Sequence, residues 1–273
     1  MHQKWKFENI KWSLFDPEKV NPDLLRIIKA GSVVEHNGSD YGIYLDNVFQ
    51  GDAVFQKEIV AWSKDEIKHG RVLAEWVKKA DPTYNFEDRF KDFVDKFPVD
   101  TQTKDSIRGS RAAELLTRCM VEIATSSFYS AVSDAADEPL LKHICAKISA
   151  DELRHYKLFY THLQRYQKIE NMTLFKRFKV AAGRLFENEG DELALAYYTA
   201  NEEKGPYDRA YCTKRYGQVV YRSYQKIHVD RAMALFCKAI GVAPRGWLQK
   251  LLSAFTYGLL SRKAKAYARS AAS

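Results

Sequence analysis

Two short segments of the chain repeat one pattern of acidic and basic residues. The segments 65–69 and 151–155 each begin with Asp-Glu and end with His. Each segment therefore places a glutamate and a histidine three residues apart. Residues separated by three positions lie on the same face of a helix, so each glutamate–histidine pair could bind one metal ion.

Each segment also has a single glutamate upstream at nearly the same distance. Glu35 lies 31 residues before Glu66, and Glu122 lies 30 residues before Glu152. If each pair lies at one height on two antiparallel helices, a turn must fall halfway between its members. The midpoints, at 50–52 and within 134–139, contain the Gly, Asp and Pro residues that end and begin helices. The spacing therefore predicts two copies of one metal-binding helical hairpin.

The predicted ligands provide four carboxylates and two imidazoles. This donor set suits a pair of iron ions, or one iron and one manganese. The alternative is that the charges lie on solvated helix faces, as isolated charged residues usually do. The repeated pattern favours the dinuclear site, whose predicted ligands are Glu35, Glu66, His69, Glu122, Glu152 and His155.

An aspartate precedes the ligand glutamate in both segments. We predict that Asp65 and Asp151 support the site by accepting hydrogen bonds from the distal nitrogens of the histidines across it. The alternative is that both aspartates face solvent.

The remaining sequence signals predict an all-α protein. Asn21-Pro22-Asp23 is suited to opening a helix, although Gly31, Gly38 and Gly42 weaken the helical pattern that follows. A long connection separates the two hairpins, which is the ferritin-like four-helix arrangement. We predict one domain over 1–273, with a core at 21–168 and further helices at 169–273. The expected segments are an extended lead-in at 1–20, helices at 21–50, 52–79, 105–136 and 138–168, and a crossover at 81–103.

Composition is consistent with a helical globular protein. The 273 residues are 46% hydrophobic and include only 13 Gly and 7 Pro. No apolar run has the length of a membrane span and the first residues lack a signal-peptide core, so a cytoplasmic location is expected. The four cysteines are widely spaced, which favours buried free thiols over disulfides or zinc ligands. They are Cys119, Cys145, Cys212 and Cys237.

The net charge of +8 favours an acidic partner. That partner could be a carrier protein, a nucleic acid or an anionic membrane surface, and the charge could also serve solubility alone.

The last hundred residues are rich in aromatic residues and basic at the end. Their tyrosines could line a substrate channel, or they could belong to the core or to a dimer interface. The segment 247–260 has an apolar face that precedes Arg262, Lys263 and Lys265. It could dock on a membrane or on an acidic carrier, but an ordinary inward-packing helix is preferred. The tyrosines in question are Tyr197, Tyr198, Tyr207, Tyr211, Tyr216, Tyr221 and Tyr224.

Three stretches resemble the soluble acyl-carrier-protein desaturases, which are ferritin-like diiron oxidases. These stretches are 62–70, the segment Glu-Ile-Ala-Thr at 122–125, and 144–155. The resemblance covers about residues 30–165 and implies that the motif glutamates and histidines bind two irons. It also places Trp62 beside the first glutamate–histidine pair and Thr125 beside the oxygen site. The alternatives are core packing for Trp62 and a hydrogen bond to its own helix for Thr125.

The sequence also departs from the desaturase pattern. Asp65 stands where the family has Glu, and Val121 stands where the family has a polar residue. Beyond about residue 170 there is no match, so the resemblance supports the metal chemistry better than the substrate.

The expected function follows from this resemblance. It is an oxygen-dependent oxidation of an unactivated C–H bond in an acyl chain, by desaturation or hydroxylation. The expected partners are acyl carrier protein, a ferredoxin-type electron donor and a second copy of the chain in a homodimer. The alternatives are hydroxylation of a tRNA nucleoside, which the positive charge permits, and iron oxidation and storage. Storage is disfavoured because about a hundred residues lie beyond the four-helix core.

Overall fold

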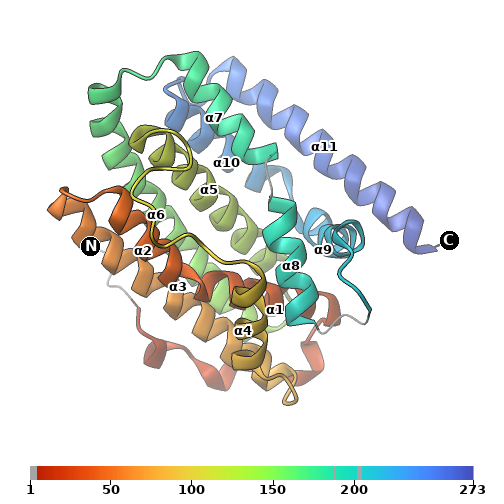
Figure 1. Ribbon diagram of the computed structural model, residues 1–273. Helices are drawn as coiled ribbons and strands as arrows, with labels where there is room; N and C mark the ends of the chain where they lie inside the picture. Colours follow the sequence, from red (N-terminus) through yellow and green to blue (C-terminus); the bar gives the residue numbers. More distant parts are fainter. Residues whose placement is uncertain (1–4, 187–188, 202–204, 273) are drawn as a thin grey trace.

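The computed structural model of the protein describes residues 5–186, 189–201 and 205–272. Within these ranges the regular structure is helical and there is no β-strand, so the all-α prediction is confirmed (Figure 1). Residues 1–4 of the predicted lead-in lie outside the described ranges. The described part of the lead-in is not simply extended, because it forms three short 3₁₀ turns, Phe7–Asn9, Trp12–Leu14 and Pro17–Lys19.

The first predicted hairpin is formed by α1, α2 and α3. Helices α1 (Pro22–His36) and α2 (Gly38–Val48) occupy the range predicted as one helix, and α3 (Ala53–Ala80) returns beside them. Asn21 caps α1 by accepting hydrogen bonds from the first-turn amides, and Asp52 caps α3 in the same way. The turn between the two arms therefore falls at the predicted midpoint.

The second predicted hairpin consists of α5 (Arg111–Ala135) and α6 (Pro139–Glu170), which pack along each other (Figure 1). Glu138 caps α6 through the amides of Leu140 and Leu141. Its carboxylate also accepts hydrogen bonds from the Trp76 indole and the Asp16 amide. One buried side chain thus joins the lead-in, the first hairpin and the second hairpin.

The crossover and the start of the third predicted helix differ from expectation. The crossover contains the helix α4 (Phe86–Lys96), because phenylalanines at helical spacing, with Phe93 fully buried, supply an apolar face. Helix α5 begins at Arg111 rather than near residue 105. Ser110 caps it there, and Gly109 adopts a positive φ of 81° just before the cap.

The first predicted helix is interrupted at Asn37 where the two arms approach most closely. A Cβ added to Gly38 would lie 2.3 Å from the Cβ of Glu66, and one added to Gly70 would lie 2.6 Å from the backbone nitrogen of His36. Glycine is therefore required on both helices at this level. The close approach holds the backbone near Glu35 against the segment that carries Glu66.

Among its described residues, the C-terminal third adds five helices to this core. They are α7 (Leu174–Phe186), α8 (Glu189–Ala200), α9 (Arg209–Ser223), α10 (Lys226–Ile240) and α11 (Trp247–Ala272). Helix α8 packs on α1, α10 packs on α5, and α11 packs on α9 and α10. Among the described residues, no helix is long and apolar enough to cross a membrane.

The cysteines and most of the tyrosines contribute to packing. All four cysteines are buried and none forms a disulfide, as predicted. Tyr197 belongs to a buried cluster of α1, α4, α8 and α9 side chains, whereas Tyr207 and Tyr211 are exposed. The other C-terminal tyrosines that pack against hydrophobic clusters are Tyr198, Tyr216, Tyr221 and Tyr224.

Replacing Gly38 by alanine should lower the melting temperature of the metal-free protein. The new methyl group is fixed to the backbone and overlaps the Cβ of Glu66, so overpacking should cost about 1–3 kcal/mol of stability. Thermal unfolding followed by circular dichroism would measure the change. The matched control is Gly258→Ala on α11, where a Cβ meets no atom within 4 Å. Equal effects of the two substitutions would contradict the close-approach explanation.

Candidate metal centre

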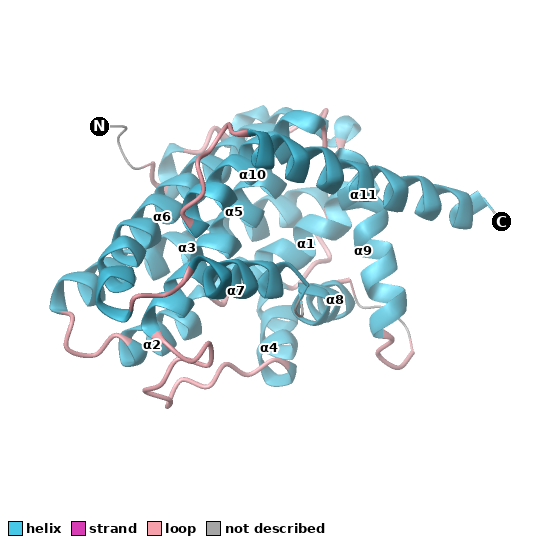
Figure 2. Cartoon of the chain, turned by 90° about the horizontal axis from the view of Figure 1, so that it is seen from above, coloured by secondary structure: helices cyan, strands magenta, loops and turns pink. Residues whose placement is uncertain are grey.

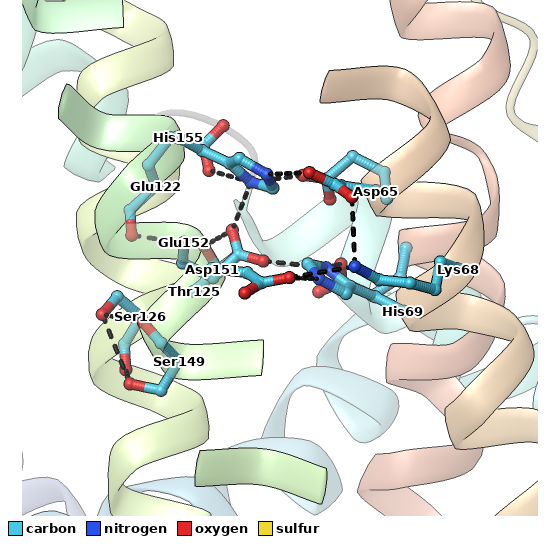
Figure 3. Close-up of polar contacts among 12 residues, drawn as sticks. Asp65, Lys68, His69, Glu122, Thr125, Ser126, Ser149, Asp151, Glu152 and His155 are labelled. Carbon is cyan, nitrogen blue, oxygen red and sulfur yellow. Dashed lines mark hydrogen bonds and ion pairs between the residues drawn. The ribbon is translucent and has the colours of Figure 1, made fainter. Parts of the chain in front are cut away.

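The six predicted ligands meet in the interior of the protein. Figure 3 labels four of them, His69, Glu122, Glu152 and His155. The six ligands form two groups whose potential ligand atoms lie within 4.8 Å of one another, and Glu66 and Glu152 belong to both groups. One group is completed by Glu35 and His69, and the other is completed by Glu122 and His155; all six residues are buried. The structure thus brings together the complete predicted set, with one shared glutamate from each hairpin. Their role as metal ligands stays a prediction.

Each histidine faces the glutamate of the other hairpin. His69 Nδ1 lies 3.0 Å from an oxygen of Glu152, and His155 Nδ1 lies 2.8 Å from an oxygen of Glu66. In this partner exchange, the histidine of α3 contacts the glutamate of α6, and the histidine of α6 contacts the glutamate of α3. The two upstream glutamates lie slightly farther from the same histidine nitrogens. His69 Nδ1 is 3.4 Å from Glu35, and His155 Nδ1 is 3.5 Å from Glu122.

The polar atoms that face the centre lack hydrogen-bond partners. One buried oxygen of each glutamate and the Nδ1 atom of each histidine make no hydrogen bond, although they lie close together. Leaving buried polar atoms unpaired is costly, so six such atoms in one place require an explanation. A pair of cations bound between them would satisfy all six. Carboxylates with imidazoles and without thiolates are the donors expected for iron or manganese. The residues present therefore fit the predicted dinuclear site.

Electrostatics support the same interpretation. Burial, together with the neighbouring charge of Glu152, raises the pKa of Glu66 well above its usual range. Burial likewise raises the pKa of Glu122 to about 8. Burial opposes the ionised form of Glu152 too, but contacts with His155 and His69 outweigh it and hold the pKa of Glu152 well below its usual range. Positive charge between the carboxylates would allow all of them to ionise together.

The distal nitrogen of His69 meets Asp151. Nε2 of His69 lies at a hydrogen-bonding distance of 3.1 Å from Oδ2 of Asp151, whose side chain is fully buried. Asp151 is also paired with Lys68 and Arg154. Burial opposes ionisation of Asp151, but the hydrogen bond with His69 and the nearby cations lower its pKa to about 2. An Nε2–H that donates to Asp151 leaves Nδ1 of His69 free to face the centre.

Asp65 occupies the equivalent place on the other side. Its Oδ2 lies 3.6 Å from Nε2 of His155, a looser contact than that between His69 and Asp151. Lys68 Nζ lies 3.0 Å from Asp65 and 3.1 Å from Asp151, so one lysine joins the two aspartates (Figure 3). Both aspartates are buried, so the solvent-facing alternative is wrong.

Thr125 and Trp62, the residues singled out from the resemblance, both lie against the centre. Thr125 Oγ1 is 2.9 Å from an oxygen of Glu152, and it is also within hydrogen-bonding distance of carbonyls in its own helix. The Trp62 indole is buried at the edge of His155, with ring centroids 6.5 Å apart, and its N–H has no hydrogen-bond partner. The geometry is therefore compatible with the places that the resemblance gives to Thr125 and Trp62. It is equally compatible with core packing of Trp62 and with a hydrogen bond of Thr125 to its own helix.

Four residues around the centre were not identified from the sequence. Lys68 and Arg154 occupy the same position of the repeated segment, immediately before the histidine, so the repeat itself contained the signal. Tyr129 had no local signal, and the sequence marks Trp5 only as one of the lead-in aromatic residues expected to pack across the outside of the bundle. The Tyr129 hydroxyl interacts with Glu35, and burial together with that carboxylate raises the pKa of Tyr129. The Trp5 ring stacks on His69 with centroids 5.9 Å apart.

Comparison with known proteins does not extend this description. The sequence matches no protein-family model, and no curated protein is significantly similar to it.

Alanine at both shared glutamates should remove more metal than alanine at one unshared glutamate. Protein loaded anaerobically with iron should hold about two ions per chain. Glu66→Ala combined with Glu152→Ala should lose nearly all of the metal, because each of these side chains belongs to both ligand groups. Glu35→Ala should keep the ion bound by the other group. Elemental analysis after gel filtration would measure the stoichiometry.

The control is Glu114→Gln, which alters a fully buried carboxylate of α5 outside both ligand groups. It should retain the wild-type metal content. One tightly bound zinc, or no metal after anaerobic iron loading, would exclude a dinuclear iron site.

Asparagine at Asp151 should weaken metal binding more than asparagine at Asp65. Changes to residues that orient metal ligands typically reduce affinity by about 10- to 100-fold. The Asp151 contact with its histidine is shorter, and its side chain is the more deeply buried of the two. Competition with a chromophoric chelator would compare the affinities. Wild-type affinity in both variants would show that neither aspartate supports the histidines.

Proposed function

We propose that this chain is a ferritin-like dinuclear iron oxidase that uses dioxygen and an external electron donor to oxidise an unactivated C–H bond. The observation that carries the proposal is the pair of buried ligand groups that share Glu66 and Glu152. Bound iron, or iron with manganese, would supply the oxygen-activating redox chemistry. The hairpin–crossover–hairpin order agrees with a ferritin-like core, in which such centres are built from facing helices.

The residues of the chain would prepare the ligands for this chemistry. Asp151 fixes the orientation of His69 through its distal nitrogen, and Lys68 limits the movement of Asp151 and Asp65. The Thr125 hydroxyl can donate its proton toward Glu152. This hydrogen bond would hold the shared carboxylate in position at the side of the centre formed by α5 and α6.

The lead-in supplies a path for electrons from a donor protein. Trp5 is buried against His69, and Lys68 lies 4.0 Å from the centroid of the Trp5 ring. Lys64, Lys68 and Arg71 line an adjacent surface pocket with Phe7 and Ile67. These cations suit an acidic donor such as a ferredoxin, which would approach the centre from the side of the lead-in.

An acyl chain on acyl carrier protein is the substrate that we propose. This part rests on the resemblance of the segments around Trp62, Thr125 and Glu152 to the desaturases, and the positive net charge agrees with an acidic carrier. The alternatives, hydroxylation of tRNA and storage of iron, use similar metal centres. The first would give a modified tRNA as product, and the second would give a large iron-filled cage.

A turnover assay should distinguish these functions. Iron-loaded protein with reductant and dioxygen should oxidise acyl carrier protein thioesters, while free fatty acids should react poorly because they lack the docking energy of the carrier. The rate should fall as salt screens the attraction between the partners. Mass spectrometry of the products would measure turnover, with the Glu66→Ala, Glu152→Ala double variant as the inactive control. Product from hypomodified tRNA alone, or assembly into a large iron-filled cage, would overturn the proposal.

A further inference from the structure

Helix α11 has an apolar stripe on its outer face. Trp247, Leu251, Phe255 and Leu259 recur every four residues, and their exposed fractions are 76%, 58%, 62% and 38%. The opposite face of the helix packs inward, where Leu252 and Leu260 contact the core. The preferred expectation of an ordinary inward-packing helix is thus true of only one face.

Helix α7 presents a second group of exposed apolar residues. Leu174, Phe175 and Phe178 are 49%, 78% and 44% exposed. Both α7 and α11 lie toward the viewer in Figure 2, on either side of α10. The Arg177 side chain of α7 reaches the Gly241 turn that follows α10, and α11 also packs on α10, so α7 and α11 adjoin the same helix. We call the four residues of the α11 stripe and these three residues of α7 the outer aromatic face.

The charges on these two helices have a single sign. Neither α7 nor α11 contains an aspartate or a glutamate. The basic residues are Lys176, Arg177, Lys179 and Arg184 on α7, and Lys250, Arg262, Lys263, Lys265 and Arg269 on α11. Exposed Trp, Phe and Leu flanked by cations without acids are typical of helices that lie in a membrane interface.

We propose that the outer aromatic face binds the surface of an anionic membrane. Helix α11 lies parallel to the bilayer, with Trp247 and Phe255 inserted at the boundary between headgroups and acyl chains. Lysine and arginine side chains at its C-terminal end contact the anionic headgroups. The protein docks on one leaflet and does not span the bilayer, in agreement with the absence of a membrane-spanning helix among the described residues.

Charge favours the membrane over a second copy of the chain. A twofold-symmetric dimer through this face would place the same patch on both sides of the interface. Each α11 would then bring its own cations against a helix that has no acidic residue to receive them. An anionic bilayer offers both an apolar interior for the aromatic residues and negative charge for the cations.

Vesicle flotation with the full chain tests this proposal. The protein should float with phosphatidylcholine vesicles that contain phosphatidylglycerol, and binding to pure phosphatidylcholine should be at least about tenfold weaker because each basic residue contributes attraction to anionic lipid. Trp247→Ser combined with Phe255→Ser should reduce binding to the anionic vesicles by at least about tenfold. Lys263→Glu combined with Lys265→Glu should reduce it to a similar extent.

The matched control is Ile107→Ser, which alters a side chain that is 70% exposed in the loop between α4 and α5, far in sequence from both helices. It should bind vesicles like the wild type. Because all the altered side chains are exposed, the variants should keep the wild-type melting temperature, and this measurement separates loss of binding from loss of fold.

Two results would overturn the proposal. One is a failure of the wild-type chain to float with anionic vesicles, or equal flotation of the Trp247→Ser, Phe255→Ser variant. The other is a wild-type dimer in analytical ultracentrifugation that this variant converts to a monomer, without vesicle binding by either protein, which would assign the face to a second copy. Neither measurement requires metal or turnover, so the result is independent of the proposed function.

Discussion

The enclosure of four carboxylates and two imidazoles in one small volume is the constraint on which the rest of the structure depends. Acidic groups at such distances repel one another in the ionised state, and burial removes the water that would screen them. Burial and the neighbouring carboxylates accordingly raise the pKa values of Glu66 and Glu122. A fold that tolerates the arrangement must either protonate part of the cluster or fill it with cations. The unpaired atoms that all face inward fit the second solution.

Much of the helical core, and the meeting of the six predicted ligands in one place, could be predicted from the sequence. The prediction succeeded because Glu66 with His69, and Glu152 with His155, follow the local periodicity of a helix. The distances to Glu35 and Glu122 then required turns where residues 50–52 and 134–139 supply them. Period and spacing are properties of the chain alone, so they can be read without a structure.

The features that were missed depend on contacts between distant segments. The break at Asn37 lies beside Gly38, where an added Cβ would overlap the Cβ of Glu66, 28 residues further along the chain. The approach of Trp5 to His69 requires the lead-in to fold back over α3, which no local pattern indicates. The outer stripe of α11 was visible in the sequence. Its exposure was not, because an apolar residue at helical spacing looks the same on a packed face and on a free one.

The partner exchange between α3 and α6 relates the two halves of the centre by an approximate twofold symmetry, and the surroundings break that symmetry. Trp5 and Tyr129 adjoin the half that contains His69 and Glu35, whereas Trp62 and Thr125 adjoin the half that contains His155 and Glu122. Two ions bound there would have equal numbers of ligands but unequal environments. Their affinities and reduction potentials would then differ, so one half would fill before the other, and a mixed pair of metals would favour one of its two arrangements.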